Sequence, residues 1–462
     1  MTEDDWLRLL AEKDARIAEL EALVAELMAR LGKNSTNSSK PPSSDDAPGR
    51  EQRRTEAAKH AKRRVKDARR KNRAKRGMLP PEAVTSSEDH KPSACKCCFR
   101  RFRATDILCD PERIQKLELP ELAPLCHEIR IFSGSCRHCD VVTSAARPAA
   151  ASTTKLGPRL RALITTLRGR YQLSHRDVVE YLADVHGIDV SLGLLSKLDG
   201  RLANEMEPAY QEAVAVTQSA PVVHADETGW SHGGIPGWLW VASVGHVSRF
   251  LIDRGRGTDA ATQLLGSANS NAVTVTDRWV AYGKRKRRQL CWAHLERNAR
   301  AVIDRGCSAA RIGTPFVDFV KRMFETWHRF LDGKITRTSM RVDIRRRLRN
   351  LRCMLALEPD IPPVAATFLR GIEKAEPHLF TFTRIEGVEP TNNLAERELR
   401  AAVIWRRKSQ ATRCDRGHRF VERALTIITS LRAQGRNVFA FLCQLLSPDI
   451  PTPLLLQAAD SP

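Results

Sequence analysis

The stretch 221–230, PVVHADETGW, decides which fold the sequence predicts. It is a short apolar run that ends on Asp226 and breaks at Gly229, which is typical of a buried strand holding an acid at the edge of a sheet. Another apolar run, AVTVTD, ends on Asp277, and the predicted helix start EPTNNLAERELR carries Glu396. Three acids from separate segments can hold two Mg²⁺ ions roughly 3.5–4 Å apart, an arrangement that cleaves phosphodiesters. The acids therefore predict a nuclease or a transposase.

The length and charge of the chain favour several domains and a polyanionic partner. A chain of 462 residues corresponds to about three domains at roughly 150 residues each. With 76 Lys and Arg against 54 Asp and Glu, the net charge is +22. We find no long apolar run and no N-terminal signal segment, so we expect a cytoplasmic, nucleoid-associated protein that binds nucleic acid and no membrane. In that compartment the twelve Cys indicate thiols and metal ligands rather than disulfides.

Residues 1–32 predict a coiled-coil helix. Between residues 6 and 31, apolar side chains recur at alternating spacings of three and four, with Lys13 as the one polar position of the seam. We expect copies of the chain to pair through this seam, which makes the protein a homo-oligomer. The alternative is an amphipathic helix that packs on its own domain.

Residues 33–85 predict a flexible linker that contains a basic tract. The tract, residues 50–76, holds fourteen Lys or Arg against three acids. We expect it to contact DNA phosphates without reading the base sequence, through side chains that include Arg63, Arg64, Arg69 and Arg70. A solvated basic tail is the alternative.

Residues 86–150 contain two Cys-x-x-Cys pairs and predict a zinc-binding β unit. The pairs, Cys95 with Cys98 and Cys136 with Cys139, can bind one structural Zn²⁺ tetrahedrally, as in a zinc ribbon. The gap between the pairs is longer than is common, and free cysteines in a small β unit are the alternative. Cys97 crowds the first pair. Cys109, Cys126 and His127 could serve as substitute ligands.

Residues 151–215 predict a unit of short helices that begin near Pro158, Ser174 and Ser191. A glycine-containing turn separates the last two helices, as in a helix-turn-helix unit whose last helix can enter a major groove. Lys197 on that helix is then a predicted DNA contact. Plain packing in a small helical bundle is the alternative.

Residues 216–299 predict the first part of an α/β core. The runs PVVHAD, GWLWVASV and SRFLID, separated by glycine-rich turns, indicate an antiparallel meander. A helix around 259–265, the run AVTVTD and the strand-like RQL before a further helix follow. The expected order β-β-β-α-β-α-β, with Asp226 on the first strand and Asp277 on the fourth, matches the ribonuclease-H-like fold, which places the two acids side by side.

The core is expected to be interrupted and then completed. Residues 300–385 predict a helical insertion whose aromatic stripe, from Phe316 to Leu331, packs inside it, although its arginine-rich stretch 345–352 could line a DNA path. Residues 386–447 return to the core with a helix that residues 391–393 cap and that carries Glu396. Residues 448–462 form a C-terminal tail. The fold class predicted is therefore multidomain α+β.

Several residues near the three acids have competing interpretations. Glu227 and Glu398 are neighbouring acids that should point elsewhere if the predicted strand and helix are right. His294 is either a packing residue at a helix start or a catalytic contact to phosphate or metal-bound water. Cys291 and His294 could alternatively bind a metal themselves. The basic residues after the third acid should hold the DNA backbone; they are Arg400, Arg406, Arg407 and Lys408.

These motifs, in their order, resemble those of the insertion-sequence-66 family of transposases over nearly the whole chain. The motifs are LGKNSTNSSKPPSSD, the two cysteine pairs, HADETGW, TD…Y followed by QLCWAH, and EPTNNLAERELR. Cys291 and His294 fall on the family's Cys-Trp-Ala-His motif. Two places depart from the family pattern: the basic tract lacks a Gly-Gln-Pro-Gly-His element, and Arg278 replaces a Gly after the second Asp.

The resemblance implies a DDE transposase with a ribonuclease-H-like core and the acidic triad Asp226, Asp277 and Glu396. It implies two Mg²⁺ ions, or Mn²⁺, as cofactors, transposon ends and target DNA as partners, and accessory proteins encoded by the element. A non-catalytic DNA-binding regulator derived from a transposase is the main alternative. A tyrosine recombinase is a second one, for which the chain offers only Tyr171, Tyr181, Tyr210 and Tyr282.

Overall fold

The structure is a computed structural model that describes most of the chain after residue 77. The described residues are 78–106, 112–120, 123–148, 155–267, 271–447 and 450–456, together with Lys13, Arg16, Ile17, Glu19, Leu20, Glu21, Val24 and Met28. The chain divides into two units, Asp45–Ala123 and the combination of Met1–Ser44 with Pro124–Pro462, and each is described by itself. None of the described helices is long and apolar enough to cross a membrane.

The described residues between Lys13 and Met28 are helical, as predicted for this segment. Ile17, Leu20 and Val24 are about half exposed, at 53%, 46% and 55%, in this single chain. The rest of the predicted coiled coil and the whole basic tract 50–76 lie outside the described residues, so pairing of two copies stays a prediction.

In the first unit, Asp45–Ala123, the structure describes two short 3₁₀ turns, η2 (Pro81–Ala83) and η3 (Ala104–Asp106). In the second, residues 133–144 form an antiparallel hairpin of β1 (Ser133–Ser135) and β2 (Val142–Ser144). Each unit thus holds one of the two Cys-x-x-Cys pairs.

The helices predicted between residues 158 and 203 are confirmed as α3 (Pro158–Gly169), α4 (His175–His186) and α5 (Leu192–Glu205). Ser174 and Asp177 form the expected capping box, with the Asp177 N–H donating to the Ser174 hydroxyl oxygen at 3.1 Å. Gly187 ends α4 in the left-handed region at φ 61°. Local capping signals therefore set these boundaries. Reading of DNA by α5 stays a prediction.

The core of the larger unit is a mixed five-stranded sheet, so the chain is a multidomain α+β protein. Its strands are β3 (Val222–Gly229), β4 (Trp238–Val244), β5 (Val247–Asp253), β6 (Val273–Thr276) and β7 (Arg288–Leu290), in the order β5-β4-β3-β6-β7. The first three strands are antiparallel neighbours, and β3, β6 and β7 are parallel. This confirms the predicted meander and places the two acid-bearing strands next to each other.

One predicted element of the core is wrong. The expected order has a helix between the fourth and fifth strands, but only the 3₁₀ turn η4 (Val280–Tyr282) connects β6 to β7. A crossover helix between parallel strands needs a dozen or more residues, and the chain has only residues 277–287 here. Ala281 and Tyr282 are buried against the sheet instead.

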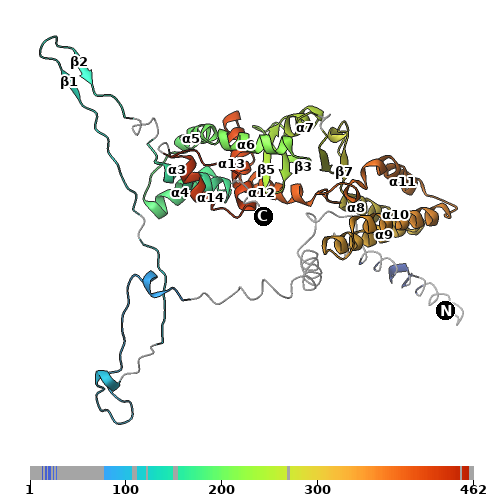
Figure 1. Cartoon of the computed structure of the whole chain (residues 1–462), viewed down its shortest axis with the longest axis horizontal. Coiled ribbons are helices and arrows are strands. Elements are labelled where there is room, and N and C mark those ends of the chain that lie inside the picture. Colours follow the sequence, from blue (N-terminus) through green and yellow to red (C-terminus); the bar gives the residue numbers. More distant parts are fainter. Residues whose placement is uncertain are drawn as a thin grey trace, which may run out of the picture. The chain divides into compact units, whose positions relative to one another are not determined.

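Helices cover both faces of the sheet. Leu239, Val241 and Phe250 pack with residues of α12 (Asn393–Ser409) and α13 (Asp415–Ala433). On the other face, Trp240, Ala242 and Leu251 pack with α7 (Thr258–Leu265). Figure 1 shows α7 above the strands and α12 below them. Helices α6 (Glu207–Ser219) and α14 (Val438–Leu445) complete the first core.

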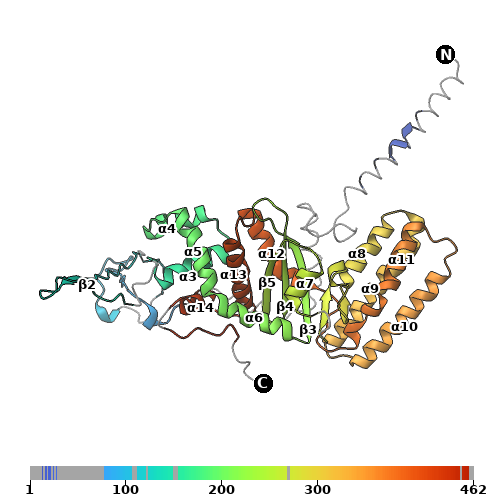
Figure 2. The same cartoon turned by 90° about the horizontal axis from the view of Figure 1, so that it is seen from above.

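The predicted helical insertion is confirmed as α9 (Cys307–Leu331), α10 (Arg337–Ala356) and α11 (Pro363–Ala375), followed by the 3₁₀ turns η5 (Glu376–His378) and η6 (Thr381–Thr383). It packs on α8 (Trp292–Ile303), with Trp292 against Phe316 and Phe319. The aromatic stripe is core as predicted, except that Leu331, at the end of α9, is 55% exposed. Figure 2 shows this helical group beyond one edge of the sheet and α3–α5 beyond the other.

Candidate active site

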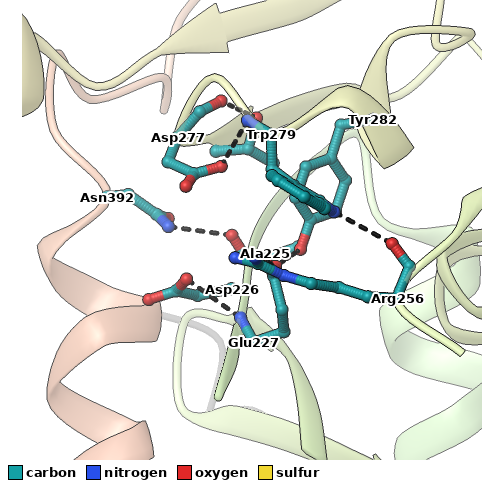
Figure 3. A network of polar contacts seen from close by, with 9 residues as sticks. Ala225, Asp226, Glu227, Arg256, Asp277, Trp279, Tyr282 and Asn392 are labelled. Carbon is teal, nitrogen blue, oxygen red and sulfur yellow. Dashed lines mark hydrogen bonds and ion pairs between the residues drawn. The ribbon is translucent and has the colours of Figure 1, made fainter. Parts of the chain in front are cut away.

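The first two acids, Asp226 and Asp277, come from neighbouring parallel strands. In β3 and β6, Val222 lies opposite Val273, Val223 opposite Thr274, and His224 opposite Val275. The same register extended by two residues brings Asp226 opposite Asp277, and the charge of Asp277 does act on the Asp226 carboxyl. Since side chains alternate along a strand, both carboxylates lie on the face of the sheet toward α12 (Figure 3).

Backbone N–H groups hold one oxygen of each of these carboxylates. The N–H of Glu227 donates to Asp226 Oδ1 at 2.9 Å, and the N–H of Trp279 donates to Asp277 Oδ1 at 2.8 Å. Each bond is local in sequence, because the donor follows its acid by one or two residues. A backbone N–H within β3 thus orients Asp226, and the turn after β6 orients Asp277.

Glu227, the residue after Asp226, lies on the opposite face of β3. Its Oε1 accepts hydrogen bonds from Arg256 Nε and Nη2 at 3.0 and 2.9 Å, and its Oε2 accepts one from the Tyr282 hydroxyl at 2.6 Å. The Arg256 guanidinium also lies over the Trp279 ring, 3.6 Å from its centroid. The alternation of the strand thus turns Glu227 away from Asp226 and gives it its own set of partners.

Asn392 ties the start of α12 to the strand that carries Asp226. Its Nδ2 donates to the carbonyl oxygen of Ala225 at 2.8 Å, and the side chain is fully buried (Figure 3). The residue holds the N-cap position as predicted for residues 391–393, but its side chain makes no capping bond. It bonds to the sheet instead, which fixes the helix that presents Glu396 one turn later.

Glu396 faces Cys291 and His294, which lie at the start of α8. His294 Nδ1 lies 3.7 Å from Glu396 Oε1, and neither atom has a hydrogen-bond partner although both are buried. The ligand atoms of Cys291, His294 and Glu396 all lie within 4.8 Å of one another. Glu398 instead accepts a hydrogen bond from Arg397 at 3.1 Å. The helix thus separates the two neighbouring acids in the way the sequence predicted.

The three acids repel one another electrostatically. Burial, and then the charges of Glu227, Asp277 and Glu396, raise the pKa of Asp226 well above its ordinary value. Burial likewise lowers the pKa of His294, and the charge of Glu396 only partly opposes this. A site that concentrates negative charge in this way is stabilised by a bound cation.

The donor atoms present fit a hard divalent cation better than a thiolate-bound metal. Burial raises the pKa of the Cys291 thiol to about 11, which disfavours the thiolate in the absence of a metal. Carboxylate oxygens are the ligands that Mg²⁺ and Mn²⁺ prefer. No tight group of ligand atoms within the described ranges includes Asp226 or Asp277.

The basic residues predicted to hold DNA differ in their surroundings. Arg406 is half-buried, and its guanidinium donates to the carbonyl oxygen of Gly229 at the end of β3. Lys408 is exposed and donates to the carbonyl oxygen of Tyr171 at 3.4 Å. The exposed side chains are Arg400 and Arg407 on α12 and Lys197 on α5, whereas Arg63, Arg64, Arg69 and Arg70 lie outside the described residues.

The two Cys-x-x-Cys pairs, each taken by itself, form the same kind of turn. The Cys95 N–H donates to the carbonyl oxygen of Arg100, and the Phe99 N–H donates to that of Cys95, with Phe99 at φ 58°. In the second turn, Cys136 bonds in the same way to Val141 and Asp140, with Asp140 at φ 54°. Hydrogen bonds from backbone N–H groups in the turns lower the pKa of Cys95 and of Cys136. Each turn therefore favours thiolates.

Sequence reasoning missed two contributors to the site. Asn392 was expected only to cap a helix, and the run of two asparagines before Glu396 gave no sign that one of them reaches across to a strand. Tyr282 entered only as part of the TD…Y motif and as a nucleophile that a recombinase would need. The tyrosine is fully buried and bonded to Glu227, so it supports the sheet and cannot attack DNA.

Comparison with known families gives two matches along the chain. The family described as "Transposase IS66 family" matches residues 154–419, which include the sheet, the three acids and the helical insertion. The "Family of unknown function (DUF6444)" matches residues 4–77. A comparison with curated proteins gives no match. Because residues 154–419 are more than half of the 462 residues, the chain belongs to the transposase IS66 family.

Proposed function

We propose that this protein is a DDE transposase whose ribonuclease-H-like core cleaves the DNA ends of an insertion sequence and joins them to target DNA. The observation that carries the proposal is the parallel pairing of β3 and β6, whose register, extended by two residues, brings Asp226 opposite Asp277. The strand order β5-β4-β3-β6-β7 supports the same core. Glu396, on the helix tied to β3 through Asn392, supplies the third acid.

Asp226, Asp277 and Glu396 would hold two Mg²⁺ ions, or Mn²⁺ in their place. When bound, such a pair of ions lowers the pKa of an attacking water and stabilises the departing 3′ oxygen. Backbone N–H groups at 2.9 and 2.8 Å orient the Asp226 and Asp277 carboxylates on one face of the sheet. Both side chains are thus held in place before an ion binds. His294 beside Glu396 is then placed to donate to a phosphate oxygen.

The proposed reaction has two steps that balance without a protein-linked intermediate. First, water attacks the phosphorus at the element's end, the bond to the 3′ oxygen breaks, and a 3′ hydroxyl and a 5′ phosphate result. Second, that 3′ hydroxyl attacks a phosphodiester of target DNA and releases a new 3′ hydroxyl. No serine or tyrosine nucleophile is required.

The exposed cations next to the third acid support binding of DNA. Arg400 and Arg407 project from α12, the helix that also carries Glu396. With the net charge of +22, they favour contacts with phosphates, which position DNA without reading its sequence. We include Lys197 on α5, and the basic tract with Arg63 and Arg70, in the proposed DNA contacts.

The N-terminal parts of the chain are proposed to assemble and stabilise it. The heptad pattern of residues 6–31 supports a homo-oligomer through a coiled coil. The like turns at Cys95–Cys98 and Cys136–Cys139 support structural Zn²⁺ as a second cofactor. Metal analysis of the purified protein that finds no Zn²⁺ would reject this part of the proposal.

Cleavage of DNA by an Asp226→Asn variant tests the proposed function. The substrate is duplex DNA that carries the sequences flanking the coding region, and binding to it is measured alongside. We expect the unaltered protein to cleave in Mg²⁺ and the variant to bind but not to cleave. Undiminished cleavage by the variant would remove Asp226 from the mechanism. Binding without cleavage by the unaltered protein would favour a non-catalytic regulator.

A further inference from the structure

A second cluster of metal-binding side chains lies beyond the end of β3. The ligand atoms of His232, Asp415 and His418 all lie within 4.8 Å of one another. The two imidazole rings meet edge to face, 4.2 Å apart between centroids. His232 Nε2 lies 4.0 Å from Asp415 Oδ1. None of these residues takes part in the acid site described above.

One ring nitrogen of this cluster has no partner. His418 Nε2 is buried and makes no hydrogen bond to any described residue. Leaving a buried polar nitrogen unpaired costs about 1–3 kcal/mol, so an atom in this state calls for an explanation. A bound metal ion provides one, because it occupies the lone pair that no protein donor reaches.

The backbone on both sides of the cluster is fixed. His232 sits in a tight turn, where its N–H and carbonyl bond to Ile235 at 2.8 and 2.9 Å. The Gly233 N–H donates to the carbonyl oxygen of Thr412 at 2.8 Å, which joins this turn to the segment before α13. Asp415 and His418 are three residues apart on α13 and therefore lie on the same face of that helix.

The cluster opens into a cavity of about 200 Å³. Asp253 and Arg254 line the same cavity as the two histidines. The Asp253 carboxylate accepts a hydrogen bond from the Gly255 N–H at 2.6 Å, so it is engaged locally. Among the described residues, Arg254 is the positive side chain that lines the cavity, and it would oppose a cation. Asp415, which is 77% exposed, is the carboxylate free to turn toward an ion.

We propose that His232, His418 and Asp415 bind one divalent transition-metal ion, Zn²⁺ first among them. Two imidazoles and one carboxylate are a ligand set that Zn²⁺ takes with an open fourth position, here toward the cavity. Mg²⁺ is a poor occupant, because it prefers oxygen ligands. The ion joins the β3–β4 connection to the start of α13, and it is separate from the metal pair proposed for the three acids.

Zinc counting on four purified full-length proteins tests this site without any DNA. The proteins are the unaltered chain, His232→Ala, His418→Ala and the control His246→Ala, which removes an exposed imidazole from the β4–β5 turn. All four keep every cysteine, so zinc bound elsewhere is the same in each. We expect the first two variants to hold one Zn²⁺ per chain fewer than the unaltered chain and the control. Equal zinc content in all four would overturn the proposal.

Two further measurements separate loss of the site from loss of the fold. Zn²⁺ added to chelator-treated protein should raise the Tm of the unaltered chain and of His246→Ala by more than it raises the Tm of His418→Ala, which keeps only the zinc site proposed for the cysteines. An equal rise in all three would contradict the site. Asp415→Asn keeps the shape of an exposed side chain, and we expect its Kd for Zn²⁺ to rise at least about tenfold. An unchanged Kd would remove Asp415 as a ligand.

Discussion

Asp226 and Glu227 are consecutive residues of one strand, so their carboxylates lie on opposite faces of the sheet and have different surroundings. Glu227 accepts hydrogen bonds from Arg256 and Tyr282 on the α7 side and is 8% exposed. Asp226 lies on the α12 side, and the charges of Glu227, Asp277 and Glu396 add to burial in raising its pKa. Removing one partner of a buried ion pair destabilises a fold, whereas a group of acids is stabilised by a bound cation. The predictions below test that contrast.

The largest expected effect is a loss of DNA cleavage on replacing Glu396, but not on replacing Glu398, the other acid compared on α12. Glu396→Gln removes the charge of the third acid while keeping its size, so we expect DNA cleavage in Mg²⁺ to fall by about 10³-fold or more, the scale of losing a group that stabilises the transition state. Glu398→Gln, the matched control two residues away, should cleave within a few-fold of the unaltered protein. Cleavage rates on the flanking DNA measure both. An equal loss in both variants would show that the helix, and not the site, had been damaged.

A smaller loss of DNA cleavage is expected on replacing Asn392, the residue that links the start of α12 to β3. Asn392→Ala removes the bond to Ala225 that positions the start of α12, so we expect cleavage to fall about 10–100-fold, as for other residues that orient metal ligands. The neighbour Asn393 is exposed, and Asn393→Ala should retain activity. Full activity of Asn392→Ala would show that Glu396 does not need this bond.

The paired acid should matter for stability. Glu227→Ala leaves the buried Tyr282 hydroxyl without its acceptor and Arg256 without its counter-ion, which we expect to lower the free energy of unfolding by about 2 kcal/mol. Urea denaturation of the purified variant measures this. Asp226→Asn in the same assay should be no less stable than the unaltered protein. The opposite ranking would reverse the contrast between the two faces.

The smallest expected effect is a dependence of stability on pH. Because burial, and then the charges of its neighbours, raise the pKa of Asp226 in the folded state, the stability that its proton contributes is complete below the ordinary pKa and is lost as pH rises through the raised pKa. In the absence of divalent ions, Asp226→Asn should therefore gain stability relative to the unaltered protein as pH rises from acid to neutral. A stability difference that stays constant over this range would show that the pKa of Asp226 is not raised in the folded state.

The sequence predicted the parts of the site that depend on local pattern. Apolar runs ending on Asp226 and Asp277 became parallel neighbours, and alternation turned Glu227 to the opposite face. Capping chemistry at Ser174 and Ser191 set two helix starts. These features follow from residues close together in the chain.

Long-range contacts could not be predicted in the same way. The bond from Asn392 to Ala225 joins residues 167 positions apart, and no pattern near either residue announces it. The prediction of a helix between β6 and β7 was wrong, because the chain between these strands is too short for a crossover helix and forms the 3₁₀ turn η4 instead. The cluster at His232 and His418 likewise arises only when the β3–β4 connection meets α13.

Replacement of Asp277 by a softer ligand tests most directly whether the acids bind the metal ion required for DNA cleavage. Asp277→Cys offers a thiolate, which Mg²⁺ binds poorly and Mn²⁺ accepts more readily. If Asp277 binds the ion, the variant should lose cleavage of the flanking DNA in Mg²⁺ and regain part of it in Mn²⁺. Cleavage by the variant in Mg²⁺ at the rate of the unaltered protein would contradict the account.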